Sequence, residues 1–292
     1  MAAIFALSAA VAYGVGDFLG GVAARRESPS AVVLWSHIVG LGMLVAVAPL
    51  IGGEPTPEAF AAGAAAGLLG GAGVALFYRG LAVGSMSVVA PIAALLSAAV
   101  PVVAGLASGE RPPAAAGLGI ALALGAVVLI SREAAPDGTG TGGPAVPHEG
   151  LAGHRRRQIE ALGLAVAAGL AFGLFFVAIS HAGDDTGVWP LVGARMASVS
   201  LFALLGAAKV TSAAPPRGAA AAAVGCGLLD AGANVLYVLA LGHGLLSVVA
   251  VLTALYPAGT VLLARYVLGE HLTPVQRAGL GLAAVAAVLI AA

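Results

Sequence analysis

The chain alternates between long apolar runs and short interruptions that contain polar residues, Pro or Gly. A hydrocarbon core about 30 Å thick requires about 20 consecutive apolar residues of helix. The first half of the chain contains five such runs, at 2–24, 30–52, 59–80, 84–107 and 113–131. The second half contains five more, at 159–181, 188–208, 217–241, 244–268 and 272–291. The pattern predicts an all-α integral membrane protein with ten transmembrane helices.

The two halves share one pattern. Residues 81–110 recur 160 positions later as residues 241–270, with the same SVVA tetrapeptide at the start of an apolar run and the same Gly-Glu pair at its end. An odd number of helices in each half makes the second half enter the membrane from the opposite side. We therefore expect two inverted five-helix repeats, a common plan of secondary transporters. The expected domains are a first repeat at 1–131, a solvated linker at 132–158 and a second repeat at 159–292.

Composition agrees with this interpretation and excludes several classes of partner. Hydrophobic residues make up 60% of the chain and charged residues 9%, whereas a soluble surface needs roughly 25–35% charged residues. The 13 basic residues balance 13 acidic ones, so no nucleic-acid partner is indicated. No nucleotide-binding loop of the G-x-x-x-x-G-K-[ST] type occurs, and nothing indicates a cofactor or a metal. The expected partners are membrane lipid and a small-molecule substrate, with the chain a monomer or homodimer.

Basic residues gather at one end of the predicted helices. By the positive-inside rule this end, which carries the linker with Arg155, Arg156 and Arg157, faces the cytoplasm, because only Arg111 lies at the other end. Both termini then face outward. We expect a multi-pass protein of the cell (plasma or inner) membrane.

These residues carry a resemblance to a known family. Each half has an aromatic-Gly pair in its first helix (Tyr13-Gly14 and Phe172-Gly173), an SVVA fourth helix and a terminal Gly-Glu pair. In these features, and over nearly its whole length, the chain resembles the EamA family of the drug/metabolite transporter (DMT) superfamily. The resemblance implies transport of small metabolites, amino acids or drugs among them.

Two acids fall well inside predicted spans, Asp17 and Asp230, and the corresponding basic residues are Arg195 and His37. An ionisable side chain in lipid costs at least about 2.5–3.5 kcal/mol, so it normally faces a cavity or a partner. These residues are candidates for a substrate or proton pathway. The alternative is that they have a structural role, as buried charge pairs or as side chains that snorkel to an interface.

Three further residues join these candidates. Asn234 lies four residues after Asp230, so both side chains project from one helix face, and interhelical hydrogen bonding is the alternative role for Asn234. Tyr13 belongs to the aromatic-Gly pair. Trp35 lies near the beginning of the second helix, where an interfacial belt is the expected role and substrate stacking the alternative.

Other recurring features suggest structural roles. Glu110 and its repeat Glu270 lie at helix ends, where a loop or cap role is expected. Pro257, like Pro91 and Pro101, lies inside a fourth-helix run and is expected to kink it. Glycines at 63, 67 and 71 form a stripe that allows close helix packing.

No catalytic motif of the HExxH or GxSxG type occurs, so an enzyme is not expected. A structural membrane subunit would not require polar residues inside the bilayer. The sequence therefore favours a secondary transporter that moves a small organic solute, with export the expected direction, by alternating access. Proton coupling through Asp17 or Asp230 and uncoupled, facilitative transport remain the alternatives.

Overall fold

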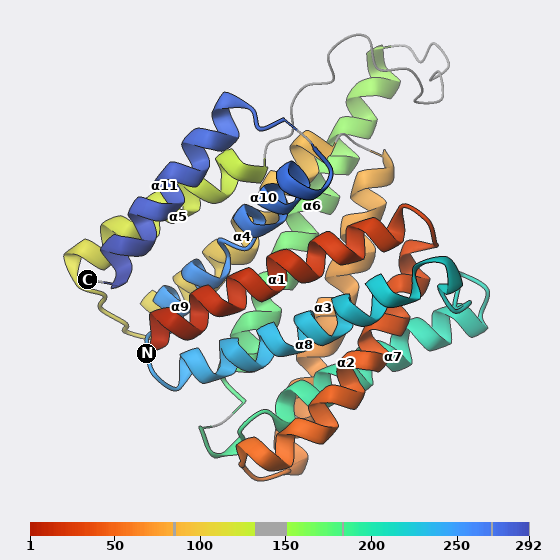
Figure 1. The fold of residues 1–292 in the computed structure, drawn as a ribbon, viewed down its shortest axis with the longest axis horizontal. Helices are drawn as coiled ribbons and strands as arrows, with labels where there is room; N and C mark the ends of the chain where they lie inside the picture. The colour runs from red at the N-terminus through yellow and green to blue at the C-terminus, as the bar shows by residue number, and fades with distance from the viewer. Residues whose placement is uncertain (84–85, 132–150, 183, 270, 292) are drawn as a thin grey trace.

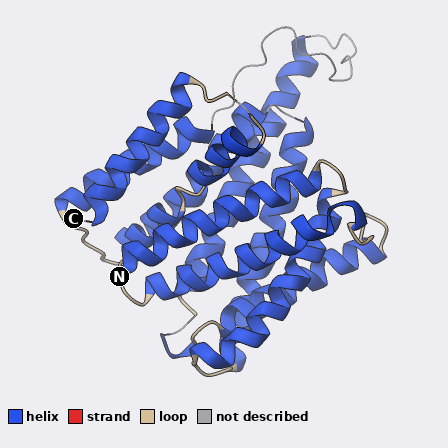
Figure 2. Cartoon of the chain, in the orientation of Figure 1, coloured by secondary structure: helices blue, strands red, loops and turns tan. Residues whose placement is uncertain are grey.

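The computed structural model describes residues 1–83, 86–131, 151–182, 184–269 and 271–291. The described part of the chain is helical and contains no strand (Figure 2). Ten helices in it are long and apolar enough to cross a membrane. The fold class predicted from the sequence is therefore confirmed.

The helices of the first half follow the predicted runs closely, because in the sequence a Gly or a charged residue comes within two residues after the end of each. Their bounds are α1 Ala2–Ala24, α2 Pro29–Ile51, α3 Pro57–Val83, α4 Met86–Ala107 and α5 Ala114–Ser131. Pro29 and Pro57 occupy first-turn positions, where proline costs no intrahelical hydrogen bond. Pro91 and Pro101 lie inside α4, which stays one helix through both of them.

The second half contains two departures from the predicted runs. Its elements are α6 Leu151–Ser180, η1 Asp184–Thr186, α7 Trp189–Ala207, η2 Arg217–Ala219, α8 Ala220–Leu241, α9 Leu246–Thr253, α10 Pro257–Val267 and α11 Pro274–Ala291. α6 begins at Leu151, inside the segment expected to be linker, because Ala, Arg and Gln are good helix formers and no proline intervenes before 159. The ninth span is divided into α9 and α10 just before Pro257, where the sequence predicts a kink.

The two halves run in opposite directions and pack mainly against each other. In Figure 1, α1 starts at the end of the bundle where α11 finishes, whereas α6 starts at the opposite end. We call these the terminal end and the linker end, because the linker directly precedes α6 in the sequence. α1 packs on α8 as α6 packs on α3, and α2 packs on α8 as α7 packs on α3. Exchanging the halves leaves this list of contacts unchanged, which is the relation expected of an inverted repeat.

Glycine contacts repeat with the same symmetry. A side chain at Gly67 of α3 would collide with the backbone of Ala194 in α7, and one at Gly227 of α8, 160 residues later, would collide with the backbone of Ser36 in α2. The Gly stripe therefore lies in a helix interface, where absent side chains let the backbones approach.

The two ends of the ninth span are packed differently. Seven of the eight residues of α9, toward the terminal end, are buried, whereas no residue of α10, toward the linker end, is buried. The described helices are thus tightly packed around α9 and loosely packed around α10.

Candidate functional site

Arg195 of α7 and Asp230 of α8 form an ion pair inside the bundle. Arg195 Nη2 meets Asp230 Oδ2, with 11% of the arginine side chain and 30% of the aspartate side chain exposed. Gly40 lets α2 approach α8 beside this pair, since a side chain there would lie 3.1 Å from Gly227 O and 3.3 Å from Ala231 Cβ. Two of the sequence-predicted candidates are therefore neighbours, and each neutralises the other's charge.

His37 links α2 to α7 beside this pair. Its Nδ1 lies 3.0 Å from Ser198 Oγ, and Ser198 Oγ donates to the backbone oxygen of Arg195 at 3.1 Å. Because the hydroxyl has one proton, His37 Nδ1 must be the donor in its own bond to Ser198. The His37 ring also meets Phe202 edge-on, with centroids 6.3 Å apart. These contacts hold α2 against α7. They give His37 a structural role, which was the alternative to a place in a substrate or proton pathway.

Asn234 stays within α8. Its Nδ2 donates to the backbone oxygen of Asp230 at 2.8 Å, so it forms no interhelical bond through this atom. Its Oδ1 is buried and has no hydrogen-bond partner in the described structure. An unused acceptor therefore lies one helical turn from the ion pair.

Asp17 has a different environment. On α1 it lies one turn after buried Tyr13, on the face opposite Ile4 and Val11, which are 65% and 61% exposed. Asp17 itself is exposed. It lies one turn after Tyr13 and one turn before Gly20, where a side chain would lie 3.1 Å from Cys226 Sγ of α8. No cation pairs with it among the described residues, so Asp17 is a bundle-facing carboxylate that protein does not fully cover and no salt bridge neutralises.

Tyr13 joins Asp17 to an aromatic cluster that spans both halves. Its ring lies 6.3 Å from Phe176 of α6 and 6.2 Å from Tyr256, centroid to centroid. Phe176 in turn lies 4.8 Å from Tyr237 of α8. The Tyr13 hydroxyl is buried without a hydrogen-bond partner in the described structure, which is costly unless another molecule satisfies it. Tyr256 is the residue before α10, so the cluster borders the break in the ninth span.

Trp35 lies apart from these groups. Its Nε1 donates to Ala213 O at 3.2 Å, in the loop between α7 and α8 at the linker end. It lines a small hollow with Pro215, Pro216 and Arg217. Trp189 makes the corresponding contact at the terminal end, where its Nε1 donates to Gly53 O at 3.2 Å. Both tryptophans therefore have positions typical of an interfacial belt.

Three members of the site were not singled out from the sequence: Phe176, Cys226 and Tyr256. Tyr256 directly precedes Pro257, and a residue beside a helix break was a usable signal. Cys226 is half-buried and borders α1, where a side chain at Gly20 would lie 3.1 Å from its Sγ. Phe176 belongs to an aromatic run in α6 whose inward side depends on the packing of the other half.

Glu110 caps a helix of the opposite half. Its Oε1 accepts a hydrogen bond from the N–H of Leu246 at 2.6 Å and its Oε2 from that of Ser247 at 2.9 Å. These are N–H groups of the first turn of α9, which no intrahelical carbonyl can reach. The cap role predicted from the sequence is present, but it joins the Gly-Glu motif of the first half to the SVVA motif of the second. Glu270 lies outside the described residues.

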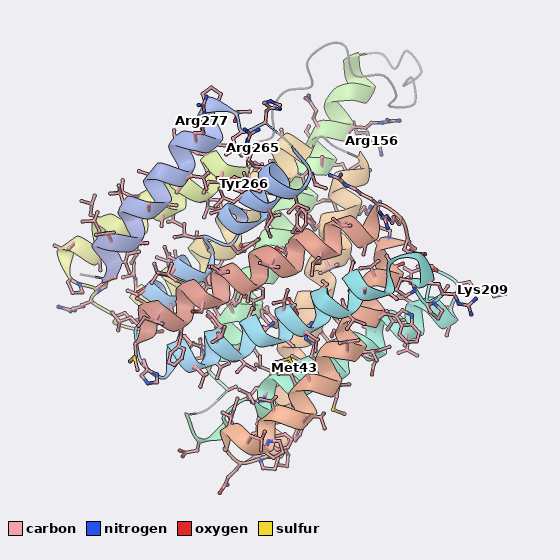
Figure 3. The ribbon with its side chains drawn as sticks, viewed as in Figure 1. Met43, Arg156, Lys209, Arg265, Tyr266 and Arg277 are labelled. Carbon is pink, nitrogen blue, oxygen red and sulfur yellow. The ribbon has the colours of Figure 1, made fainter. Side chains whose placement is uncertain are left out.

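Charge at the two ends is unequal. Arg156, Lys209, Arg265 and Arg277 all lie at the linker end of the bundle (Figure 3). Arg79 lies there too, paired with Glu160 at 3.3 Å. The basic residues used to orient the chain by the positive-inside rule therefore lie together at one end of the folded bundle.

Comparisons with known proteins agree with this architecture. The sequence matches the EamA-like transporter family over residues 1–132 and 160–292. A solved structure titled "Crystal structure of protein" is similar over 99% of this chain and 95% of its own, with a TM-score of 0.77 and 16% sequence identity. At that identity the likeness shows the fold alone. A comparison with curated protein sequences finds no match. Because the family match covers both five-helix repeats, the chain belongs to the EamA-like transporter family, a group of multi-pass membrane transporters.

Proposed function

We propose that this protein is a secondary transporter that carries a small organic solute by alternating access and couples it to protons through Asp17. The observation that supports the proposal most strongly is the state of Asp17, an exposed carboxylate on the bundle-facing side of a membrane helix, without a cation beside it in the described structure. Such a carboxylate must bind a proton or a cationic ligand before the site can be closed off from one side of the membrane and opened to the other at low cost.

Asp230 is the weaker candidate for the coupling residue. Its charge is already balanced by Arg195, so binding a proton there would leave a buried guanidinium without a partner. The titratable groups that interact with Asp17 are Tyr13 on its own helix, Cys226 on α8 and Tyr256 beside α10. Arg195 also acts on Tyr13 and Cys226, but its positive charge is already balanced by Asp230.

The uneven packing of the bundle supports an access route from the linker end. Asp17 lies nearer this end than Tyr13 does, and α10, which borders it, contains no buried residue. At the terminal end, α9 is buried and its first turn is capped by Glu110. We infer that water reaches Asp17 from the linker end while the terminal end is closed. If the linker end faces the cytoplasm and the protein lies in the cell membrane, the solute binds from the cytoplasm and is exported.

The test is flux through the full-length protein in proteoliposomes, screened with amino acids, sugars and cationic drugs with and without a pH gradient. We expect gradient-driven flux of at least one solute. Asp17→Asn should abolish the response to the gradient, and Glu160→Gln, an exposed acid at the linker end, should behave as wild type. Equal gradient-driven flux in well-folded Asp17→Asn would remove Asp17 from the mechanism, and gradient-independent flux in the wild type would support an uncoupled carrier instead.

A further inference from the structure

The charged side chains inside the bundle differ in whether another protein group already pairs with them. Among the described residues, Arg195 is the one Lys or Arg away from a helix end, and Asp230 neutralises it. His37 is held by Ser198. Asp17 is therefore the one charged side chain of this interior without a protein partner. The described interior carries a net negative charge, which a solute with a positive charge would complete.

The surroundings of Asp17 suit an organic cation. Tyr13, one turn away, is nine-tenths buried, and its hydroxyl has no partner in the described structure. The Tyr13 ring lies 6.3 Å from that of Phe176 and 6.2 Å from that of Tyr256, centroid to centroid. Aromatic faces attract ammonium groups through the ring quadrupole, and the attraction increases when water is excluded. A carboxylate one helical turn from an aromatic ring is the chemistry that recognises an alkylated ammonium group, and the adjoining rings also offer apolar surface for the rest of the ligand.

An anionic solute has no equivalent site. The guanidinium of Arg195 would have to release Asp230 before it could bind a carboxylate, and this would leave Asp230 unpaired in the bundle. The free acceptor of Asn234, Oδ1, also suits a donor rather than an anion.

We propose that the solute carried by this protein is an organic cation, an amine or quaternary ammonium with an aromatic or aliphatic body, whose charged nitrogen binds Asp17 against the rings of Tyr13 and Tyr256. The proposal rests on the proposed transport function and assigns its substrate class. Because the cation and the proton share one carboxylate, binding of one displaces the other, and the exchange is proton antiport.

Cys226 provides a binding assay that requires no transport. It is the single cysteine of the chain, and its Sγ would lie 3.1 Å from a side chain at Gly20, one turn after Asp17 on α1. We would measure the rate at which N-ethylmaleimide alkylates Cys226 in the detergent-solubilised full chain, with increasing benzyltrimethylammonium, benzyl alcohol or phenylacetate. These probes share a benzyl group and differ in charge.

The expected result is slower alkylation with benzyltrimethylammonium and no protection by phenylacetate or benzyl alcohol at equal concentration. Asp17→Asn should raise the half-protecting concentration by about tenfold or more, since a charged partner is lost. Tyr13→Leu should raise it by about 3- to 30-fold through loss of the ring, whereas Tyr13→Phe keeps the ring and should have the smaller effect. Glu160→Gln is the matched control. Protection by phenylacetate alone, or equal protection of Asp17→Asn by the cation, overturns the proposal.

Transport separates this inference from the function on which it rests. Benzyltrimethylammonium has a permanent charge and cannot carry a proton across lipid by itself, so proton release from proteoliposomes on its addition reports antiport. Release with the cation supports both claims. Gradient-driven flux restricted to sugars or acidic solutes leaves the transport function standing and overturns the cation assignment. Absence of coupled flux with every solute overturns both.

Discussion

The Glu110 cap lends itself to a quantitative stability test. The perturbation is Glu110→Gln, which keeps the size of the side chain but leaves one oxygen to accept from two N–H groups. Leu246 and Ser247, which donate them, are 8% and 0% exposed, so water cannot replace the lost acceptor. The exchange removes one hydrogen bond of 2.6 or 2.9 Å together with a negative charge at a helix N-terminus.

The expected cost is the sum of two effects. A buried N–H without an acceptor costs about 1–3 kcal/mol, and loss of the favourable charge at a partly buried helix N-terminus costs about 0.3–2 kcal/mol. We therefore expect a destabilisation of roughly 2–4 kcal/mol. At about 2–4 °C for each kcal/mol, the apparent Tm should fall by on the order of 5–10 °C. The effect is large for an element of 8 residues because the capped turn is a substantial part of α9.

The assay is thermal unfolding of the purified full chain in detergent, followed by loss of monodisperse protein on size exclusion. Glu58→Gln is the control, because Glu58 is an exposed acid in the first turn of α3 at the same end of the bundle. A second variant tests the cap without removing its charge. A side chain at Gly105 would lie 2.8 Å from the Glu110 carboxyl carbon, so Gly105→Ala should destabilise, although helix propensity alone predicts a gain of about 1 kcal/mol. Wild-type Tm in Glu110→Gln, or a raised Tm in Gly105→Ala, would refute the reasoning.

Three further predictions concern packing and orientation. Asp230→Asn should destabilise the fold by about 3 kcal/mol, because it leaves the guanidinium of Arg195 buried without a counter-charge. A double variant that also replaces Arg195 by Met should recover much of this stability, and no recovery in thermal unfolding would show that loss of the ion pair is not the cause. Gly67→Leu should abolish monodisperse protein, since its side chain would meet the backbone of Ala194, whereas normal yield would contradict the close contact of α3 and α7. A green fluorescent fusion after Ala292 should stay dark while alkaline phosphatase at that position is active, as expected if both termini face outward; the opposite pattern reverses the orientation and leaves the fold unchanged.

Hydrophobic periodicity and punctuation were sufficient to determine the ten helices and their inverted repeat. A span must be about 20 apolar residues long wherever it packs, so its bounds are a local property of the sequence. Proline chemistry alone did not decide the break before Pro257, because α4 stays one helix through Pro91 and Pro101. The start of α6 was predicted less well. Gly, Pro and Thr between 132 and 150 led us to expect a linker over the whole of 132–158, although the helix-forming residues after 150 extend α6 back to Leu151. The candidates Asp17, Arg195 and Asp230 were also found locally, since a charge in an apolar run is conspicuous.

Only the tertiary structure decided which of these charges are paired. Arg195 and Asp230 lie 35 positions apart and are joined because α7 and α8 both pack on α2, whereas Asp17 faces the bundle from α1 and meets no cation in its described part. The Glu110 cap is non-local in the same sense: the motif at the end of one repeat satisfies N–H groups at the start of α9 in the other. Helix length and lipid exposure depend on neighbouring residues along the chain, but the partner of a buried polar group depends on which helices the packed backbones bring together, and that requires the fold.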